Sequence, residues 1–313
     1  MTAAQAVERF VQPGSQVVLG GFTVSRNPMH LTREIIRQGI GDLHLVVHSH
    51  GQAMDLLIGA GCVARLEIAY GGTGRFAPTC LCFRRAVAAG ALEVEDYSNF
   101  QMSLRFLAGS LGIPFIPSRS GFGTDLIAKE GFGPATRALP GVANQKLIVQ
   151  ENPFDPTEKV VLLPALNPDV ALLHAQYVGE DGTVRIKGLT FADVEQARAA
   201  KRVIVSCEEI VPTEFLRQDP DQNTLPPFMV DAVVLSPWGA HPTAAFYFYD
   251  YDPAHLRHYG QVARDEAGFQ AYLAQWVHGP ASQEAYLAQI PSTDLVRLRA
   301  NPVTGYAPGL DRR

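Results

Sequence analysis

Four glycine-rich turns are the features of this sequence best suited to chemistry, because each follows a run of residues that predicts a buried strand. Glycine lets backbone N–H groups approach a bound molecule closely, and the carboxyl ends of parallel strands meet at one edge of a sheet. Turns at that edge predict a site that holds a ligand largely through backbone amides. The turns are Gly20-Gly21, Tyr70-Gly71-Gly72-Thr73-Gly74-Arg75, Ser120-Gly121-Phe122-Gly123-Thr124-Asp125 and Trp238-Gly239-Ala240-His241-Pro242.

The first of these turns is the strongest candidate for a binding role. Gln16 to Leu19 is a short strand-like run, and it leads directly into Gly20-Gly21-Phe22-Thr23-Val24-Ser25-Arg26-Asn27-Pro28. Asn27 before Pro28 predicts a capped helix that begins at the proline. The positive end of its dipole would face the turn and favour an anionic ligand there. A turn that only joins a strand to a helix is the alternative interpretation.

His241 lies in the last of the turns and directly precedes Pro242. A residue before proline is restricted to extended backbone conformations, so this turn could direct the imidazole ring toward a ligand. For an isolated histidine, however, we expect a hydrogen-bonded structural role.

Motifs for metal binding, serine hydrolysis and nucleotide binding are incomplete. His48-Ser49-His50 and Cys80-Leu81-Cys82 each place two metal-ligating residues on one strand face, but neither has a second pair at the customary spacing. We therefore expect no metal site. The hydrolase motif Gly-x-Ser-x-Gly does not occur, and Ser118-Arg119-Ser120-Gly121 lacks its first glycine. The third glycine of a dinucleotide-binding turn and the Gly-Lys-Ser/Thr of a phosphate loop are also missing.

No carboxylate stands out as a nucleophile from its spacing. Glu93, Glu95 and Asp96 lie close together, and a solvated strand edge explains them. Glu208 and Glu209 follow an expected strand, where adjacent glutamates usually face solvent.

Apolar runs of strand length alternate with helical patterns along the chain. This alternation predicts an α/β fold with an open, mainly parallel sheet covered by helices. Most of the runs are continuous, which is typical of strands buried on both faces. The expected strands are Gln16 to Leu19, Leu43 to His48, Ala64 to Tyr70, Leu92 to Glu95, Lys146 to Gln150, Lys159 to Leu163, Val170 to Tyr177, Arg202 to Cys207 and Ala232 to Leu235. The clearest helices are Pro28 to Gln38, Asn99 to Leu111 and Glu266 to Val277.

The clearest internal break is Asn152-Pro153-Phe154-Asp155-Pro156. Val160 to Leu163 resumes as a buried strand directly after it, so this segment is interpreted as a loop within one unit. We therefore expect residues 1–313 to form a single domain.

Composition excludes several classes of protein. The 313 residues carry a formal net charge of −5 at pH 7, and clustered basic residues that would bind nucleic acid are missing. No apolar run approaches the roughly 20 residues of a membrane span, and residues 1–10 lack the pattern of a secretory signal. The chain has four cysteines, which make a poor disulfide framework for its length and indicate a reducing cytoplasm.

Short sequence blocks occur in a fixed order from the first strand to the last third of the chain. They are Leu19-Gly20-Gly21-Phe22-Thr23, Glu34-Ile35-Ile36-Arg37-Gln38-Gly39, Asp55-Leu56-Leu57-Ile58-Gly59, Glu95-Asp96-Tyr97-Ser98, Gly112-Ile113-Pro114-Phe115, Glu151-Asn152-Pro153-Phe154, His174-Ala175-Gln176, Asp181-Gly182-Thr183-Val184-Arg185-Ile186, Cys207-Glu208-Glu209-Ile210, Val230-Asp231-Ala232-Val233-Val234, Gly239-Ala240-His241-Pro242 and Tyr249-Asp250-Tyr251-Asp252. Together they resemble the α chain of glutaconate CoA-transferase, and this chain is identified as a member of the family I CoA-transferase α subunits.

This resemblance implies a heteromeric enzyme whose α and β chains share one α/β sandwich and form the active site between them. In that family a glutamate attacks the acyl-CoA thioester, forms an acyl-glutamyl anhydride, and becomes a glutamyl-CoA thioester in a ping-pong cycle. Glutaconate CoA-transferase carries this glutamate on the β subunit. The resemblance therefore implies a coenzyme A thioester with a dicarboxylic or 3-oxo acyl group as substrate and a carboxylate as acceptor. It also implies no permanently bound cofactor, a β-subunit partner and no catalytic nucleophile on this chain.

We expect this chain to supply part of the acyl pocket and polar contacts to the substrate. Arg26 is the natural partner for a second carboxylate on the acyl group, because its guanidinium can bind two oxygens at once; an arginine that caps the turn toward solvent is the alternative. Gly72-Thr73-Gly74 departs from the Asn-Ser-Gly that the glutaconate enzyme looks to have, which implies a reshaped pocket. The expected binding residues are Gly20, Gly21, Phe22, Thr23, Ser25, Arg26, Gly72, Thr73, Gly74, Asn99, Gly239 and His241.

Two alternative functions stay open at this point. The steroid-ring-opening hydrolases that act on CoA thioesters resemble the chain more weakly, and they carry a catalytic glutamate where this chain has Asn99. An amide cannot act as a general base, although Glu95 is a replacement candidate if the alignment shifts. A non-catalytic scaffold subunit is the other alternative, with Trp276 and the cluster Phe246-Tyr247-Phe248-Tyr249 as an interface.

Overall fold

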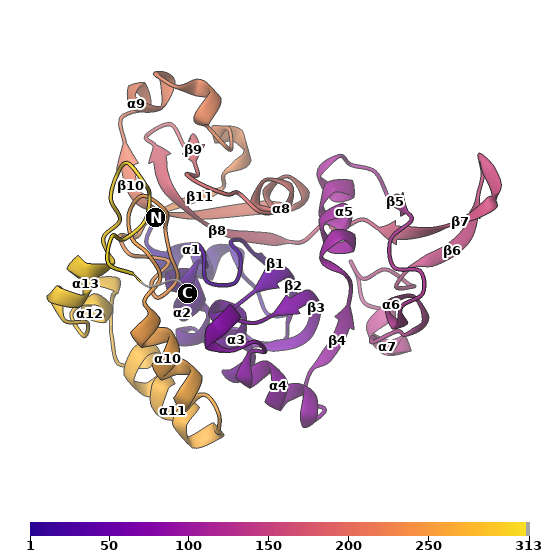
Figure 1. Cartoon of the computed structure of the whole chain (residues 1–313), viewed down its shortest axis with the longest axis horizontal. Coiled ribbons are helices and arrows are strands. Elements are labelled where there is room, and N and C mark those ends of the chain that lie inside the picture. The colour runs from indigo at the N-terminus through magenta and orange to yellow at the C-terminus, as the bar shows by residue number, and fades with distance from the viewer. Residues whose placement is uncertain (311–313) are drawn as a thin grey trace.

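The fold is built around one eight-stranded, mainly parallel sheet, shown in the computed structural model of Figure 1, which describes residues 1–310. The strand order is β11-β10-β8-β1-β2-β3-β4, and β9 pairs antiparallel with β8. The other pairs of this sheet are parallel. The strands are β1 (Gln16–Leu19), β2 (Leu43–His50), β3 (Val63–Gly71), β4 (Glu93–Asp96), β8 (Val170–Gly179), β9 (Val184–Arg185), β10 (Arg202–Val211) and β11 (Ala232–Leu235).

Alternate side chains of the strands enter two hydrophobic cores, one on each face of the sheet. Val17 and Leu19 belong to the first core, whereas Val18 between them belongs to the second, as the two-residue period of a strand requires. Helices that contribute to the first core are α1 (Ala3–Phe10), α2 (Met29–Arg37), α3 (Gln52–Gly59), α4 (Leu81–Ala88), α10 (Pro253–Val262) and α11 (Glu266–Leu273). The second core receives α5 (Asn99–Ser110) and α8 (Asp193–Ala199).

A second, antiparallel sheet extends beyond α5 as an arm, at the right of Figure 1. Its strands follow the order β5-β7-β6, and Phe154 between β6 and β7 is 95% exposed. The arm contains β5 (Phe115–Ser118), β6 (Ile148–Asn152), β7 (Asp155–Pro164), α6 (Asp125–Ala128) and α7 (Pro134–Arg137). The remaining α-helices of residues 1–310 are α9 (Thr213–Arg217), α12 (Gln283–Leu287) and α13 (Ser292–Leu298).

The predicted fold class is confirmed, and each expected strand is present with ends shifted by a few residues. The prediction that Asn27 caps α2 is wrong: Pro28 is the N-cap residue, and Nδ2 of Asn27 donates to the carbonyl oxygen of Ser25 over 3.3 Å. The last predicted helix also changes form, because α11 ends at Leu273 and continues as a π-helical turn over Ala274–His278.

The four cysteines are all free and buried. Burial raises the pKa of Cys62 to about 11 and that of Cys207 to about 12, and it also raises the pKa values of Cys80 and Cys82. The thiols therefore act as small packing groups in the two cores. None of the helices formed by residues 1–310 has the length and apolar character needed to cross a bilayer.

Candidate active-site edge

The candidate site lies at the carboxyl ends of β1, β2 and β3, where three turns meet. The amide of Thr23, in the turn after β1, donates to the carbonyl oxygen of Ser49 over 3.1 Å. A Cβ atom added to Gly51 would lie 2.2 Å from the Thr23 carbonyl oxygen and 3.1 Å from Cγ2 of Thr73, which follows β3. A side chain at position 51 would block this approach, so glycine there brings the Thr23 and Thr73 turns together.

Ser49 and His50 join the end of β2 to the neighbouring parts of the site. The Ser49 hydroxyl donates to Oδ1 of Asn99 over 2.6 Å, and Asn99 is the exposed first residue of α5. Nε2 of His50 donates to the carbonyl oxygen of Gly20 over 3.0 Å. Burial lowers the pKa of His50 to about 4, so its ring is neutral at pH 7. Sequence reasoning missed both roles, although the position of these residues at a strand end was the available signal.

Arg26 holds the glycine turn from its buried side. Its side chain is fully buried, and Nη1 lies 2.5 Å from Oδ2 of Asp193, the first residue of α8. The guanidinium also donates to the carbonyl oxygens of His174 and Leu189 over 3.2 and 2.7 Å. Oδ1 of Asp193 accepts the N–H of Gly21 over 2.8 Å. Protein acceptors therefore occupy Nη1 and Nη2 of this guanidinium and give Arg26 a positioning role, although its buried Nε has no hydrogen-bond partner among the described residues. Contact of Arg26 with a substrate carboxylate stays a prediction.

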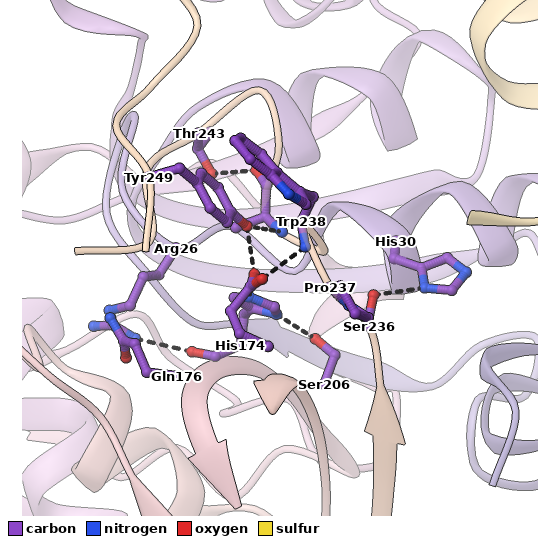
Figure 2. Close-up of polar contacts among 12 residues, drawn as sticks. Arg26, His30, His174, Gln176, Ser206, Ser236, Pro237, Trp238, Thr243 and Tyr249 are labelled. Carbon is purple, nitrogen blue, oxygen red and sulfur yellow. Dashed lines mark hydrogen bonds and ion pairs between the residues drawn. The ribbon is translucent and has the colours of Figure 1, made fainter. Parts of the chain in front are cut away.

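A buried polar network behind the turn centres on Glu208, and Figure 2 labels the residues that donate to it. Its carboxylate accepts from Nε2 of His174 at 2.7 Å, the Tyr249 hydroxyl at 2.5 Å and the backbone N–H of Trp238 at 2.6 Å. Nδ1 of His174 lies 2.8 Å from Oγ of Ser206. The expectation that Glu208 faces solvent is therefore wrong, because three donors from separate segments stabilise the carboxylate inside the protein.

Glu95 is also buried, so the expected solvated edge is wrong for this residue. Its carboxylate forms an ion pair with Arg137 and accepts the N–H of Gly131 over 2.6 Å. The exposed carboxylates at these two strand ends are Glu93, Asp96 and Glu209.

Backbone amides of the glycine turns are already used inside the protein. The N–H of Gly20 donates to the carbonyl oxygen of Leu172 over 2.9 Å, and that of Phe22 to Ser25 over 2.8 Å. Other turn amides with protein acceptors are those of Gly72, Thr73, Gly239 and His241. These amides are therefore not available to a ligand, and the wider expectation that the turns hold a ligand largely through their amides stays a prediction.

His241 and Gly239 lie behind the turn, in the protein interior. Nδ1 of His241 lies 2.7 Å from the Tyr286 hydroxyl, and Nε2 lies 3.2 Å from Oδ2 of Asp252. Burial lowers the pKa of His241. The expected hydrogen-bonded structural role is confirmed for this histidine. A Cβ atom at Gly239 would lie 2.8 Å from Cε1 of His174, so glycine allows the two segments to pack.

Donor atoms of His241, Asp252 and His255 lie within 4.8 Å of one another, a spacing that a metal site would need. Each of these residues already has a protein partner. Nε2 of His255 lies 2.6 Å from the Tyr272 hydroxyl, and Asp252 caps α10 by accepting two backbone N–H groups. This arrangement favours a hydrogen-bonded cluster that positions α10.

The structure gathers some of the predicted binding residues and separates others. Those at the carboxyl edge of β1 to β4 are Gly20, Gly21, Phe22, Thr23, Gly72, Thr73 and Asn99. Ser25 is half-buried and pairs with Phe22 and Ala244. Gly74 is exposed and begins a 3₁₀-helix over Gly74–Phe76.

A cavity of about 440 Å³ adjoins this edge between α5 and α8. Phe22 from the glycine turn and Phe100, the neighbour of Asn99, both line it. The size falls within the range of small-molecule sites, which is about 300–1,000 Å³. The lining consists of Phe22, His48, Phe100, Ser103, Leu104, Leu107, Phe191, Ala192 and Glu195.

Comparison with curated proteins finds relatives along almost the whole chain. The α chain of the glutaconate CoA-transferase of Acidaminococcus fermentans is 39% identical over 307 residues, which cover 98% of this chain and 96% of that protein. The corresponding chain of the 3-oxoadipate CoA-transferase of Pseudomonas knackmussii is 34% identical over 293 residues, covering 93% and 97%. The cholesterol ring-cleaving hydrolase IpdA subunit of Rhodococcus jostii is 30% identical over 286 residues, covering 90% and 92%.

The solved structure of glutaconate coenzyme A-transferase from Acidaminococcus fermentans superimposes with a TM-score of 0.95. The match is 39% identical and covers 98% of this chain and 97% of that chain. The family model described as Coenzyme A transferase matches residues 1–236, which include the turns after β1, β2 and β3 and all the strands. The chain belongs to the coenzyme A transferase family.

Proposed function

We propose that this chain is the α subunit of a heteromeric CoA-transferase that moves coenzyme A from an acyl-CoA to a carboxylate acceptor. The observation that supports this best is the state of the buried acids around the site. Asp193, Glu208 and Glu95 are each held by protein donors, which suits them to positioning and not to nucleophilic attack. Related chains are named as one subunit of their enzymes, which fits a nucleophile supplied by a partner.

The proposed cycle begins when a glutamate of the partner chain attacks the thioester carbonyl carbon. The carbon–sulfur bond breaks, coenzyme A leaves as a thiolate, and an acyl-glutamyl anhydride remains. The thiolate then attacks the glutamyl carbonyl of the anhydride, which releases the acyl group as a carboxylate and leaves a glutamyl-CoA thioester. The acceptor carboxylate reverses these two steps and leaves as the new acyl-CoA.

Asn99 is the residue of this chain that we place nearest the reacting carbonyl. Its Oδ1 accepts the Ser49 hydroxyl, which fixes the side-chain amide, and Asn99 is exposed, so we expect its Nδ2 to offer N–H groups to the substrate. Donors fixed in advance stabilise the negative charge that develops on a carbonyl oxygen under attack. Thr23 and Thr73, which Gly51 brings together, would complete the wall on this side.

We propose a coenzyme A thioester as the substrate, a β-subunit partner and no permanently bound cofactor. The free, buried cysteines favour a reducing compartment, and we propose the cytoplasm as the site of action.

The test is co-expression of this chain with the product of the neighbouring open reading frame, followed by an assay for CoA transfer from an acyl-CoA to acetate. We expect transfer by the assembled enzyme and none by either chain alone. Borohydride reduction of the enzyme after incubation with acyl-CoA should modify one glutamate of the partner. Transfer by the isolated chain, or modification of one of its own acids, would overturn the proposal.

Hydrolysis is less well supported than transfer. Asn99 cannot accept a proton in the manner of a carboxylate, and Glu95, the replacement candidate, is fully buried in its ion pair with Arg137. The same assay separates the possibilities: release of free coenzyme A at the same rate with and without acetate would indicate a hydrolase.

A scaffold role predicts neither reaction, and core packing already accounts for Tyr249, which is 1% exposed.

A further inference from the structure

We infer that the assembled enzyme prefers acyl groups without a second carboxylate, and that the cavity between α5 and α8 binds their apolar part. This inference rests on the proposed CoA-transferase function and specifies its substrate class. The related glutaconate and 3-oxoadipate CoA-transferases are named for dicarboxylic acids, so the substrate class inferred here differs from theirs.

The cavity begins beside the residues proposed to contact the thioester. Phe22 directly precedes Thr23 in the glycine turn, and Phe100 directly follows Asn99 at the start of α5. An acyl chain whose carbonyl lies near Asn99 can therefore extend between α5 and α8. The volume of about 440 Å³ is ample for an acyl group of six carbons.

Aromatic rings form the walls of the cavity nearest the turn. Phe22 and Phe191 stack with ring centroids 4.7 Å apart and an interplanar angle of 12°, and Phe22 lies 5.9 Å from the ring of His48. Leu104 and Leu107 of α5 add aliphatic surface. Such a surface favours apolar acyl groups, because it removes their methylene groups from water.

The charges around the cavity oppose a carboxylate. Its lining contains no lysine or arginine among the described residues, and its one acidic member is Glu195. His48 lies with Nε2 2.9 Å from the Ser103 hydroxyl, and burial lowers its pKa, so its ring is neutral at pH 7. Arg26 passes over the Phe191 ring at 5.8 Å, but its charge is neutralised by Asp193. A carboxylate placed here would lose water without gaining a cation.

A matched pair of substrates tests this inference on the co-expressed enzyme. Hexanoyl-CoA and adipoyl-CoA have acyl chains of equal carbon number and differ only in a terminal carboxylate. With acetate as acceptor, we expect kcat/KM for hexanoyl-CoA to be at least tenfold higher. Equal values, or a preference for adipoyl-CoA, would overturn the inference while leaving the CoA-transferase function standing. Failure with every acyl-CoA would instead contradict the proposed function.

A cation introduced into the cavity lining tests whether this cavity causes the preference for hexanoyl-CoA over adipoyl-CoA. The variant Leu107→Arg should shift the ratio of kcat/KM values toward adipoyl-CoA by tenfold or more, because it adds the missing cation. Leu111→Arg is the matched control: Leu111 lies one turn further along the chain, is 62% exposed and does not line the cavity. The control should keep the wild-type ratio.

Glu195→Gln provides a second variant that introduces no large side chain. Removing this carboxylate should raise the adipoyl-to-hexanoyl ratio several-fold. If Leu107→Arg does not fold, as judged by its melting temperature and circular dichroism, the Glu195→Gln result decides. An unchanged ratio in every folded variant of the cavity would show that another surface selects the acyl group.

Discussion

At the scale of single residues, Arg26 and Asp193 couple stability to the shape of the site. Their ion pair is fully buried, and Asp193 also accepts the N–H of Gly21. Removing one member of such a pair leaves an uncompensated charge in a low-dielectric environment. The pair therefore fixes the turn from behind, where no substrate needs to reach it.

We expect Arg26→Met to lower the free energy of unfolding by about 3–5 kcal/mol, because it leaves the Asp193 carboxylate without its cation. The double variant Arg26→Met with Asp193→Asn should lose less than the sum of the single changes, since no unpaired charge remains. Chemical denaturation of the assembled enzyme measures both. A stable Arg26→Met enzyme that loses only dicarboxylic substrates would instead support the substrate contact predicted from the sequence.

The same scale shows what the sequence could not reveal about the site. Gly20, Thr23 and Thr73 were recognisable because glycine turns follow apolar strands at one sheet edge. The burial of Glu208 was not, because its donors come from His174, the Trp238 backbone and Tyr249, in three segments that only the tertiary fold brings together. The sequence around two adjacent glutamates does not indicate which distant residues will donate hydrogen bonds to them.

At the scale of elements, α5 connects helix capping with function. Ser98 caps this helix through a capping box with Gln101, and its hydroxyl accepts the Gln101 N–H over 3.1 Å. Asn99 is the first residue of the helix, so the cap determines where its amide lies. A loss of the cap should therefore affect both stability and turnover.

We expect Ser98→Ala to lower the free energy of unfolding by about 1 kcal/mol and to lower kcat/KM for transfer several-fold. Ser282→Ala is the matched control, because the Ser282 hydroxyl caps α12 through the corresponding N-cap bond, accepting the Ala285 N–H over 3.2 Å without a reciprocal side-chain bond. It should cost similar stability and leave kcat/KM unchanged. Equal kinetic effects in both variants would argue against a role for the α5 cap in positioning Asn99.

The elements that the sequence predicted well are those with buried surroundings. Every strand of the central sheet with a continuous apolar run was found, because burial on both faces produces that run. The arm gave a weaker signal: β5 contains Pro117 and is exposed at two of its four positions, and β6 is exposed at four of its five positions. With only two residues, β9 is too short to leave a pattern.

At the scale of the whole molecule, neutral histidines that are buried or half-buried set the response to acid. Burial lowers the pKa of His30 to about 3 and that of His50 to about 4, and it also lowers those of His48, His241 and His255. The unfolded chain titrates these groups near 6.5. Between pH 6.5 and about 4 it therefore binds more protons than the folded protein, so stability falls as the pH is lowered.

We expect the free energy of unfolding to fall from pH 7 to pH 5, with a slope approaching about 1.4 kcal/mol per pH unit for each such histidine. His50→Gln should reduce that slope by one proton, whereas His278→Gln, at an exposed position, should leave it unchanged. Urea denaturation at a series of pH values measures the slopes. A slope that is the same in wild type and His50→Gln would contradict the burial of a neutral ring at this position.

Glu67 extends this response to lower pH. Burial alone would raise its pKa, but the adjacent Arg105 and His44 outweigh that effect and lower it to about 2. The stabilising contribution of Glu67 is therefore present above about pH 4.5 and is lost as the pH falls toward 2.

The expectation that residues 1–313 act as a single domain stays a prediction. One cooperative unfolding transition in the urea denaturation experiments would support it.

The inaccessible sulfur atoms have a practical consequence for enzymology. Disulfide reagents such as DTNB react with thiolates, and every cysteine of this chain is both buried and shifted away from ionisation. Under native conditions the cysteines of this chain should thus add almost nothing to the absorbance change. That change should report free coenzyme A together with any reactive cysteine of the partner. Uptake of reagent beyond the partner's own thiols would then report unfolding of this polypeptide during storage.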